Sequence, residues 1–399
     1  MKQIIKRGSF FTLMFLLLGC LSLYAADNDL ITKQITIKLE KAGTMPDRIG
    51  SSRKYKITNL KIIGEINGSD LWMIREMAGS DYRGDSTDGK LSVLDLSEAK
   101  IVEGGDYYYK DNKDNHYYTS NDVIGSYAFY SCSGLTSLTL PAGITSIGDR
   151  AFQDCSRLTS LTLPAGITSI GWYAFRGCSG LTSLTLPTGI TSIGYCTFWG
   201  CSGLTSLNLP AGITSIDYYA FWGCSGLTSL NLPAGITEIG KYAFVGCSGL
   251  TSLNLPAGIT SIGDAAFRGC SGLTSLNLPA GITEIGSYAF YGCSGLTSIY
   301  VYAEKVPKIG SNAFEECDAK KCTLYVPMGT YDDYWLSEFG DYFENIVEFE
   351  ATGIDKTTTS TDVEEVARYS VNGQRLSAPT KGLNIVKYSD GSVKKVAVR

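Results

Sequence analysis

Residues 124–146 read IGSYAFYSCSGLTSLTLPAGITS, and this 23-residue unit returns along much of the chain. Phenylalanine recurs at the same interval from Phe129 to Phe290, and cysteine recurs from Cys132 to Cys293. A ninth, degenerate unit keeps four of the repeated residues, Ile309, Phe314, Cys317 and Pro327. Self-similarity at a fixed period of roughly 20–50 residues is the signature of solenoids, propellers and repeat arrays. The sequence therefore predicts a repeat fold over residues 124–327.

Each unit contains the parts of one coil. Residues 135–140 (LTSLTL) end in alternating apolar and polar residues, which is typical of a short strand with one buried face. Pro141 and Gly143 then turn the chain, Ile144 and Ile147 indicate a second extended piece, and the Tyr-Ala-Phe-x-x-Cys segment closes the coil as a helical turn. Because one coil cannot bury its own leucines, we expect a β-rich, right-handed stack of coils around a continuous core.

The ends of such a stack need caps, because an open end exposes apolar side chains and unpaired strand edges. The composition divides the chain into seven parts, which are a signal peptide (1–26), an α/β N-terminal cap region (27–90), an irregular first repeat with a tyrosine-rich insertion (91–123), the 23-residue repeats (124–327), a C-terminal cap (328–350), a polar, Thr-rich linker (351–366) and a β-rich tail (367–399).

The first 26 residues have the three parts of an export signal. Lys2, Lys6 and Arg7 precede an apolar core at residues 10–18, and small residues follow. Cleavage near Ala25 or Ala26 would release a soluble chain, whereas Leu-Leu-Gly-Cys at 17–20 resembles a lipobox that would place a lipid on Cys20. No later segment is long and apolar enough to be a transmembrane helix. We expect an exported protein at the cell surface (outer membrane) or outside the cell.

Several classes of function are disfavoured by composition. His116 is the one histidine of the chain, so a histidine metal cluster is impossible and a Ser-His-Asp triad would depend on this residue alone. No phosphate loop, nucleophile elbow or metal motif appears. The formal net charge is −5 and no basic run lies after the signal, which argues against nucleic acid. We predict no catalytic residues, no metal and no cofactor.

The repeated cysteines allow two interpretations. Exported proteins can oxidise cysteines, and neighbouring coils would bring them within the Cα distance of a disulfide. Each repeated cysteine follows the repeated phenylalanine by three residues, however, as a small core residue would, and free cysteine packs as a buried hydrophobe. Cys196 and Cys322 lie off this pattern and are the better candidates for pairing or oxidation.

Comparison of the units with one another shows which positions vary, and these positions point to a ligand surface. Equivalent positions in stacked coils lie side by side, so variable residues form stripes along the stack. The central units concentrate aromatic residues and one arginine at such positions, and we predict that they bind a ligand: Trp172, Tyr173, Arg176, Tyr195, Trp199, Tyr218, Tyr219, Trp222 and Tyr242. Trp, Tyr and Arg carry most of the energy in protein interfaces. The alternative is that these rings fill gaps between coils.

Two further surfaces are weaker candidates. The outward strand positions carry Ser and Thr, and then Asn from Asn208 to Asn277, which would suit hydrogen bonding to a glycan or simply reflect strand preference. The insertion at 104–121 contains five tyrosines and His116. Long aromatic loops are often functional, although this one would equally cover the first coil.

Two segments resemble known families. The phrase SYAFYGCSGLTSIYV at 287–301 and its equivalents resemble the BspA-like leucine-rich repeats of surface proteins from Bacteroides-group bacteria and treponemes, and residues 91–109 resemble their first segment. This resemblance covers residues 124–327 and implies a leucine-rich-repeat solenoid and a surface protein, since some members are implicated in adhesion to host proteins. The tail, with Gly373, Lys381-Gly382-Leu383 and Lys394-Lys395-Val396, is similar to type IX secretion sorting domains, and its alternative is a small β-hairpin cap.

These observations favour a non-catalytic, adhesin-like binding protein. We expect it to present the aromatic residues to a host or matrix protein or to a surface glycan. The alternatives are a glycan-binding accessory protein and a purely structural rod that associates with itself. Contact with a membrane is expected only through a lipid on Cys20 or attachment by the sorting tail.

Overall fold

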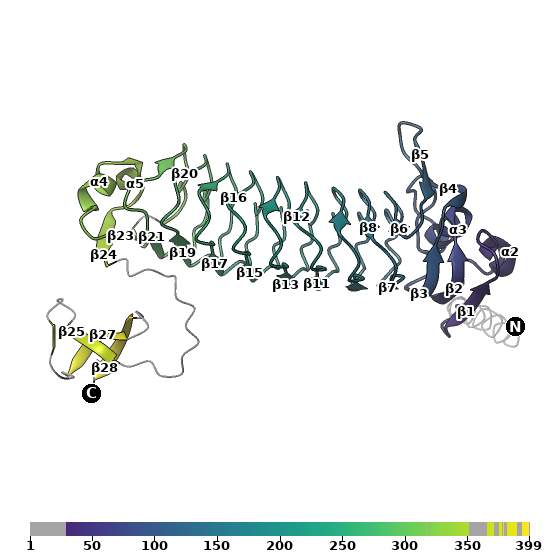
Figure 1. Cartoon of the computed structure of the whole chain (residues 1–399), viewed down its shortest axis with the longest axis horizontal. Helices are drawn as coiled ribbons and strands as arrows, with labels where there is room; N and C mark the ends of the chain where they lie inside the picture. The colour runs from purple at the N-terminus through teal and green to yellow at the C-terminus, as the bar shows by residue number, and fades with distance from the viewer. Residues whose placement is uncertain are drawn as a thin grey trace, which may run out of the picture. The chain divides into compact units, whose positions relative to one another are not determined.

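The structure is a computed structural model, and it describes residues 29–318, 320–350, 365–370, 375–376, 378, 381–388 and 393–398. The predicted signal peptide, Cys20 and residues 351–364 of the predicted linker lie outside the described residues. The chain forms two compact units, Met1–Val347 and Glu348–Arg399. The first unit contains the repeats and is a stack of coils with a small α/β cap at its N-terminal end, as the sequence predicts (Figure 1).

Each coil contributes one short strand to each of two sides of the stack. On the first side the strands are β7 (Ser137–Thr139), β9 (Ser160–Thr162), β11 (Ser183–Thr185), β13 (Ser206–Asn208), β15 (Ser229–Asn231), β17 (Ser252–Asn254), β19 (Ser275–Leu278), β21 (Ser298–Val301) and β23 (Thr323–Pro327). On the second side they are β6 (Val123–Ile124), β8 (Ser146–Ile147), β10 (Ser169–Ile170), β12 (Ser192–Ile193), β14 (Ser215–Ile216), β16 (Glu238–Ile239), β18 (Ser261–Ile262), β20 (Glu284–Ile285) and β22 (Lys308–Ile309). Each of these strands pairs in parallel and in register with at least one neighbour, so that Leu207 faces Leu184 and Ile216 faces Ile193. The pairing is interrupted between β9 and β11 and between β13 and β15 on the first side, and between β10 and β12 on the second.

The third side of the stack consists of turns, and we call it the turn side. It spans residues 125–132 in the first unit and their equivalents. The sequence suggested a helical turn here, and this was wrong. The residue before Ala-Phe has a left-handed backbone in every coil, with φ of 61° at Tyr127 and 58° at Tyr219. A second left-handed residue precedes the cysteine, for example Gly223 at φ 71°. Two such residues in each coil prevent helix from forming.

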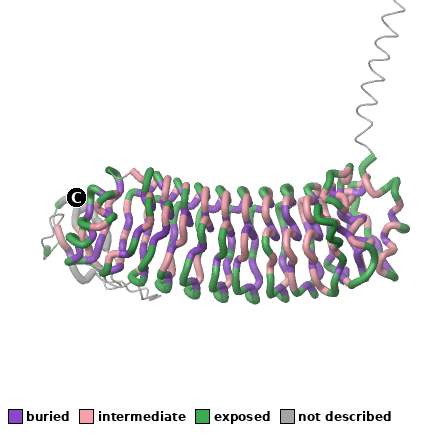
Figure 2. The backbone as a smooth tube through the Cα atoms, turned by 90° about the horizontal axis from the view of Figure 1, so that it is seen from above, coloured by how far each residue is buried: buried purple, intermediate pink, exposed green. Residues whose placement is uncertain are grey.

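Buried residues recur at the same places in successive coils (Figure 2), and their side chains form a core that repeats from coil to coil. The phenylalanine rings stack nearly parallel, with centroids 5.4 Å apart between Phe198 and Phe221 and 5.0 Å apart between Phe221 and Phe244. From Cys155 to Cys317, each repeated cysteine donates its S–H to the carbonyl oxygen of a phenylalanine in the preceding coil, as Cys224 does to Phe198 at 3.1 Å. All described cysteines are free thiols. The prediction of buried thiols is therefore confirmed over that of disulfides.

The N-terminal cap continues one sheet of the stack. It consists of β1 (Ile35–Leu39), α2 (Met45–Ile49), β2 (Asn59–Ile66), α3 (Gly68–Met77) and β3 (Val93–Ile101). The strand order β1-β2-β3-β7-β9 joins the cap to the first coils through parallel pairs. Helix α3 begins at a capping box in which Asn67 and Asp70 bond each other's backbone N–H groups, and it ends near the buried Arg75.

An antiparallel hairpin stands out beside the cap (Figure 1). It is formed by β4 (Gly104–Lys110) and β5 (His116–Thr119), and it is the tyrosine-rich insertion of the sequence. At the other end of the stack lie α4 (Tyr331–Trp335), α5 (Glu338–Tyr342) and β24 (Asn345–Phe349). Phe343 covers the last ring of the phenylalanine column, with its centroid 5.3 Å from that of Phe314. The column therefore ends against aromatic side chains and not in water.

The second unit is a small antiparallel sheet. Its strands are β25 (Glu365–Ser370), β26 (Arg375–Leu376), β27 (Gly382–Tyr388) and β28 (Val393–Val398), in the order β26-β25-β27-β28. Within this unit Lys387 and Glu350 form an ion pair. The β-rich pattern of the tail is thus present as strands, while Gly373 of the sorting-like pattern lies outside the described residues.

Candidate functional site

The nine residues of the predicted ligand surface lie together on the turn side, and we call them the aromatic stripe. Tyr173 contacts Tyr195 edge to face at 5.2 Å, and Tyr195 contacts Tyr219 in the same way at 5.7 Å. Trp199 and Trp222 stack at 5.3 Å, and Tyr219 and Tyr242 stack at 5.0 Å. The coil repeat therefore brings residues from four successive units into one continuous surface.

The stripe has a packed part and an exposed part. Trp199, Tyr219, Trp222 and Tyr242 are half-buried because each covers the faces of its neighbours. Trp172 and Tyr218, in contrast, are 58% and 45% exposed. The four half-buried rings therefore fill space between coils, whereas Trp172 and Tyr218 face outward, and ligand binding by the stripe stays a prediction.

The exposed rings border an open hollow of about 620 Å³. Its lining consists of Asp149, Arg150, Trp172, Tyr173, Tyr195, Asp217 and Tyr218. This volume lies within the range of small-molecule pockets, which is roughly 300–1,000 Å³. Trp172 and Tyr218 occupy the same position in their coils and are two coils apart, which is roughly 10 Å at the spacing of paired strands. The hollow thus offers two outward rings with Tyr195 between them.

The backbone of the two exposed rings is held by carboxylates. Asp149 accepts a hydrogen bond of 2.8 Å from the backbone N–H of Trp172, and Asp217 accepts one of 2.7 Å from that of Tyr218. A hydrogen bond between Tyr173 and Tyr195 raises the pKa of Tyr195 to about 12, so this phenol stays protonated. The hollow therefore combines rings, carboxylates and a phenol.

Arginines join the rings of the stripe to the first coils. The Arg176 guanidinium lies 5.1 Å from the ring centroid of Trp199, and that of Arg150 lies 4.6 Å from the centroid of Tyr173. Sequence reasoning did not select Asp149, Arg150 or Asp217. An alignment of the units could have found Asp149 and Arg150. Asp149 occupies the same repeat position as Trp172, and Arg150 occupies the same position as Tyr173.

Two expectations about cysteine need correction. Cys196 occupies a stripe position, yet its side chain is fully buried, and burial raises its thiol pKa. Cys322 is also fully buried, and burial raises its thiol pKa to about 11. Because thiolate is the reactive form, neither is the oxidation-prone residue that the sequence suggested.

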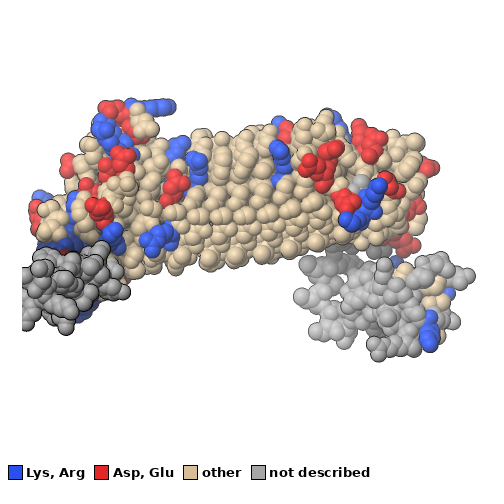
Figure 3. All heavy atoms as spheres, turned by 180° about the vertical axis from the view of Figure 1, so that it is seen from behind, with Lys and Arg blue, Asp and Glu red and all other residues tan. Residues whose placement is uncertain are grey.

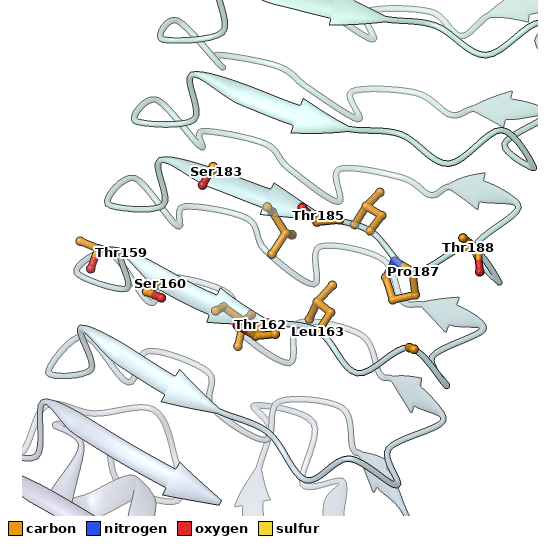
Figure 4. A pocket seen from close by; sticks show the side chains of 12 residues that line it. Thr159, Ser160, Thr162, Leu163, Ser183, Thr185, Pro187 and Thr188 are labelled. Carbon is orange, nitrogen blue, oxygen red and sulfur yellow. The ribbon is translucent and has the colours of Figure 1, made fainter. Parts of the chain in front are cut away.

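Threonines that precede the strands of the strand face stabilise the stacking of the coils. Thr159 donates its hydroxyl to the carbonyl oxygen of Thr136 at 3.0 Å, and Thr205 donates to Thr182 in the same way. The parallel pairing is interrupted between β9 and β11, which fall in different sheets. There a hollow of about 520 Å³ opens between hydroxyl side chains of both strands, with Leu163 and Pro187 at one end (Figure 4). On the turn side the backbone bonds continue, as between Phe175 N and Thr197 O at 2.9 Å.

Charge is concentrated away from the repeats. Residues 124–300 contain six acidic and five basic residues, and on the face shown in Figure 3 charged side chains gather towards the two ends of the stack. No group of three or more His, Cys, Asp or Glu side chains suited to a metal ion occurs among the described residues. In the part of the chain that the structure describes, every helix is too short or too polar to cross a bilayer.

Parallel coils with repeated leucine, phenylalanine and cysteine columns define a leucine-rich-repeat solenoid. The profile of the BspA type leucine rich repeat region, in six copies, matches residues 105–228 and 214–337. The chain belongs to this family, since these matches cover more than half of it.

The chain is also similar to solved bacterial proteins. A leucine-rich repeat protein of T. pallidum is 25% identical, with 49% of this chain and 80% of that chain covered and a TM-score of 0.37. One from Bacteroides ovatus is 21% identical, with 79% and 92% covered and a TM-score of 0.32. A leucine rich cell surface protein from Faecalibacterium prausnitzii is 22% identical, with 67% and 87% covered and a TM-score of 0.35. No curated protein matches the chain.

Proposed function

We propose that the chain is a non-catalytic, adhesin-like binding protein of the cell surface. The stripe presents its exposed rings to a host or matrix protein or to a surface glycan. The observation that carries the proposal is the exposure of Trp172 and Tyr218 in one row, on either side of Tyr195, around a hollow of about 620 Å³. Burying rings of this size stabilises a complex, and interface energy concentrates in Trp, Tyr and Arg.

A glycan is a specific candidate for the partner. The hollow combines outward aromatic rings with the carboxylates of Asp149 and Asp217. Rings can stack on the apolar faces of sugars, and carboxylates accept hydrogen bonds from hydroxyl groups. A glycan-binding accessory protein is therefore the second candidate function.

Self-association has its own supporting observation. Met328, Trp335 and Leu336 are exposed on the C-terminal cap, Leu336 at 83%. Contiguous exposed apolar side chains often mark contact surfaces. A rod that contacts another copy end to end through this cap is the structural alternative, and it needs no ligand on the stripe.

Export and anchoring belong to the same proposal. The supporting features are the signal-like residues 1–26, the lipobox-like cysteine at position 20 and the resemblance of residues 367–399 to sorting domains. Lipidation of Cys20 and sorting through the tail are alternative anchors. Mass spectrometry of the mature protein from its native host distinguishes them, because a lipid on Cys20 and loss of the tail give different masses.

Binding is tested with the purified mature chain on a glycan array and on a panel of extracellular-matrix proteins. We expect saturable binding that is lost in the Trp172→Ala/Tyr218→Ala variant and weakened in Trp199→Ala/Trp222→Ala. The matched control is Tyr331→Ala/Trp335→Ala, which removes an exposed Tyr and Trp from the C-terminal cap. Binding that survives the Trp172/Tyr218 change would contradict the stripe, and self-association lost only in the control variant would favour the rod.

A further inference from the structure

A second hollow lies between the β4–β5 hairpin and the first two coils, and we call it the hairpin pocket. It encloses about 470 Å³, a volume typical of ligand sites. Its walls include Tyr109 and Tyr117 from the hairpin segment, Tyr127 and Tyr130 from the first coil, and Arg150 and Gln153 from the second. It is therefore built where the inserted hairpin meets the repeats, and a regular coil stack has no equivalent.

The pocket walls are rich in hydrogen-bonding groups. Tyr109 and Tyr127 stack at 4.4 Å, so their phenol groups are held by ring packing. Burial raises the pKa of Tyr117 to about 12, which keeps its hydroxyl protonated. Gln153 is only 5% exposed, and its amide nitrogen donates to Asp154 while its Oε1 has no hydrogen-bond partner. Buried polar atoms nearly always have hydrogen-bond partners, so the Gln153 Oε1 is an acceptor that still lacks a donor.

The charges in the pocket favour an anion. The only carboxylate in its lining, Asp111, already accepts hydrogen bonds from the backbone of Lys113, from Asn115 and from Tyr117. The side chains of Lys113 and Arg150 also line the pocket, and among the described residues no carboxylate is close enough to form an ion pair with either. The Arg150 guanidinium lies over Tyr173, 4.6 Å from its ring centroid, and donates to the Tyr127 hydroxyl at 2.9 Å. An arginine fixed in this way retains N–H groups for an incoming anion.

We propose that the hairpin pocket binds an anionic sugar residue. Arg150 and Lys113 hold its carboxylate or sulfate, and the tyrosine hydroxyls and the Gln153 amide bind its hydroxyl groups. Charge-assisted hydrogen bonds from a planar guanidinium suit both anions. The many neutral hydroxyl and amide groups favour a sugar over an acidic peptide, which would offer fewer hydroxyl partners. This pocket shares Arg150 with the hollow at the exposed rings of the stripe, but Lys113, Tyr117 and Gln153 do not line that hollow, so the Lys113→Gln variant tests the pocket separately from the proposed function.

The test is calorimetric titration of the full mature chain with three hexasaccharides. A hyaluronan hexasaccharide carries carboxylates, a chondroitin sulfate hexasaccharide carries carboxylates and sulfates, and chitohexaose is neutral. We expect both acidic probes to bind, more weakly at high salt, and chitohexaose not to bind. The tighter of the two acidic probes identifies the preferred anion.

Variants locate the binding. Arg150→Gln and Lys113→Gln should each weaken binding of the acidic probes at least tenfold. The matched control is Arg268→Gln, because Arg268 also lies over a tyrosine, Tyr291 at 5.1 Å, but far along the chain from the hairpin. Lys113 is on the exposed hairpin tip, so its variant keeps the test valid even if Arg150→Gln fails to fold. Absence of acidic-probe binding, unchanged affinity in Lys113→Gln, or tighter binding of hexaglutamate would each overturn the proposal.

Discussion

Arg75 donates a hydrogen bond of 2.7 Å from Nη1 to the backbone carbonyl oxygen of Tyr127, and so ties helix α3 of the cap to the first coil. The arginine is fully buried, and it also donates to the carbonyl of Ala128 and to Ser80 and Asp81. The carbonyl of Ala128 therefore receives from a side chain the kind of hydrogen bond that Ala151 in the next coil receives from the backbone N–H of Phe129.

Replacing Arg75 should destabilise the cap more than the loss of a surface arginine. In Arg75→Leu the buried carbonyl of Ala128 loses its donor, while that of Tyr127 keeps the backbone N–H of Tyr130, and the loss costs about 2 kcal/mol. Arg157→Leu is the control, because Arg157 is exposed, and we expect a change within about 0.5 kcal/mol. Guanidinium unfolding followed by circular dichroism measures both values. Equal losses of unfolding free energy in the two variants would show that Arg75 does not stabilise the end of the first coil.

Core rings and stripe rings should respond differently to truncation. Phe221 is fully buried between two other rings, so Phe221→Ala should cost about 4 kcal/mol. Trp172 is mostly exposed, so Trp172→Ala should cost less than about 1 kcal/mol while removing ligand binding. Chemical unfolding and the binding assay are run on the same preparations. A large loss of stability in Trp172→Ala would show that this ring supports the packing of the coils.

The thiols should be inert in the folded protein. Ten of the eleven described cysteines are buried, and only Cys317 is partly accessible. Burial raises the pKa of Cys201 to about 12, so little thiolate exists at pH 8. Titration with Ellman's reagent at pH 8 should label at most Cys317 before unfolding and all eleven afterwards. The Cys317→Ser variant should abolish the native signal, and rapid labelling that persists in this variant would contradict the buried thiols.

Stability should fall at alkaline pH because of the same thiols. Burial raises the pKa of Cys201 and Cys247 from 9.0 to about 12, so the folded state holds these protons more tightly than the unfolded state. Their contribution is complete below about pH 9 and is lost as pH rises towards 12, by up to about 1.4 kcal/mol per pH unit for each thiol. Guanidinium midpoints at pH 7, 9 and 11 measure the fall. The Cys201→Ala/Cys247→Ala variant should show a shallower slope, and an unchanged slope would assign the effect to other groups.

Alanine substitutions at two glycines should distinguish the effect of backbone strain on stability from that of steric overlap. Gly223 has φ 71°, and an added Cβ would meet only the Gly200 Cα at 3.8 Å, so Gly223→Ala should cost about 1 kcal/mol from backbone strain alone. At Gly226 an added Cβ would lie 2.5 Å from the carbonyl oxygen of Ser202, which forces the coils apart. Gly226→Ala should therefore lower the thermal midpoint clearly more than Gly223→Ala. The reverse order would mean that the turn, and not the coil spacing, limits stability.

The repeat period predicted the fold because stacked coils must place equivalent residues side by side. The spacing of Phe129 and Cys132 along the units was enough to predict the core column and the reduced thiols. The left-handed backbone at Tyr127 was not predictable in this way, because tyrosine has no local preference for that conformation and only the stacked turns impose it.

The candidate sites were predictable only in part. Trp172 and Tyr218 were found because they vary within one row of the repeat, and the structure places them in one hollow. The insertion at 104–121 was named as a weaker candidate, but the hairpin pocket was not predictable, because an inserted hairpin has no counterpart in the repeat and its position over Arg150 and Gln153 depends on tertiary packing. The repeat period predicts where equivalent residues of the coils lie, but it does not predict which coils an inserted hairpin packs against.

Neighbouring coils repeat the same kinds of contact, so the length of the stack can change only by whole coils. Recombination between near-identical 23-residue units would add or remove one coil without altering the joints on either side. An event in the units that follow Tyr242 would move the C-terminal cap by about 4.8 Å relative to the aromatic stripe and leave both surfaces chemically unchanged. The number of repeats alone could thus set the spacing between two binding surfaces, while residue substitutions change what each surface binds.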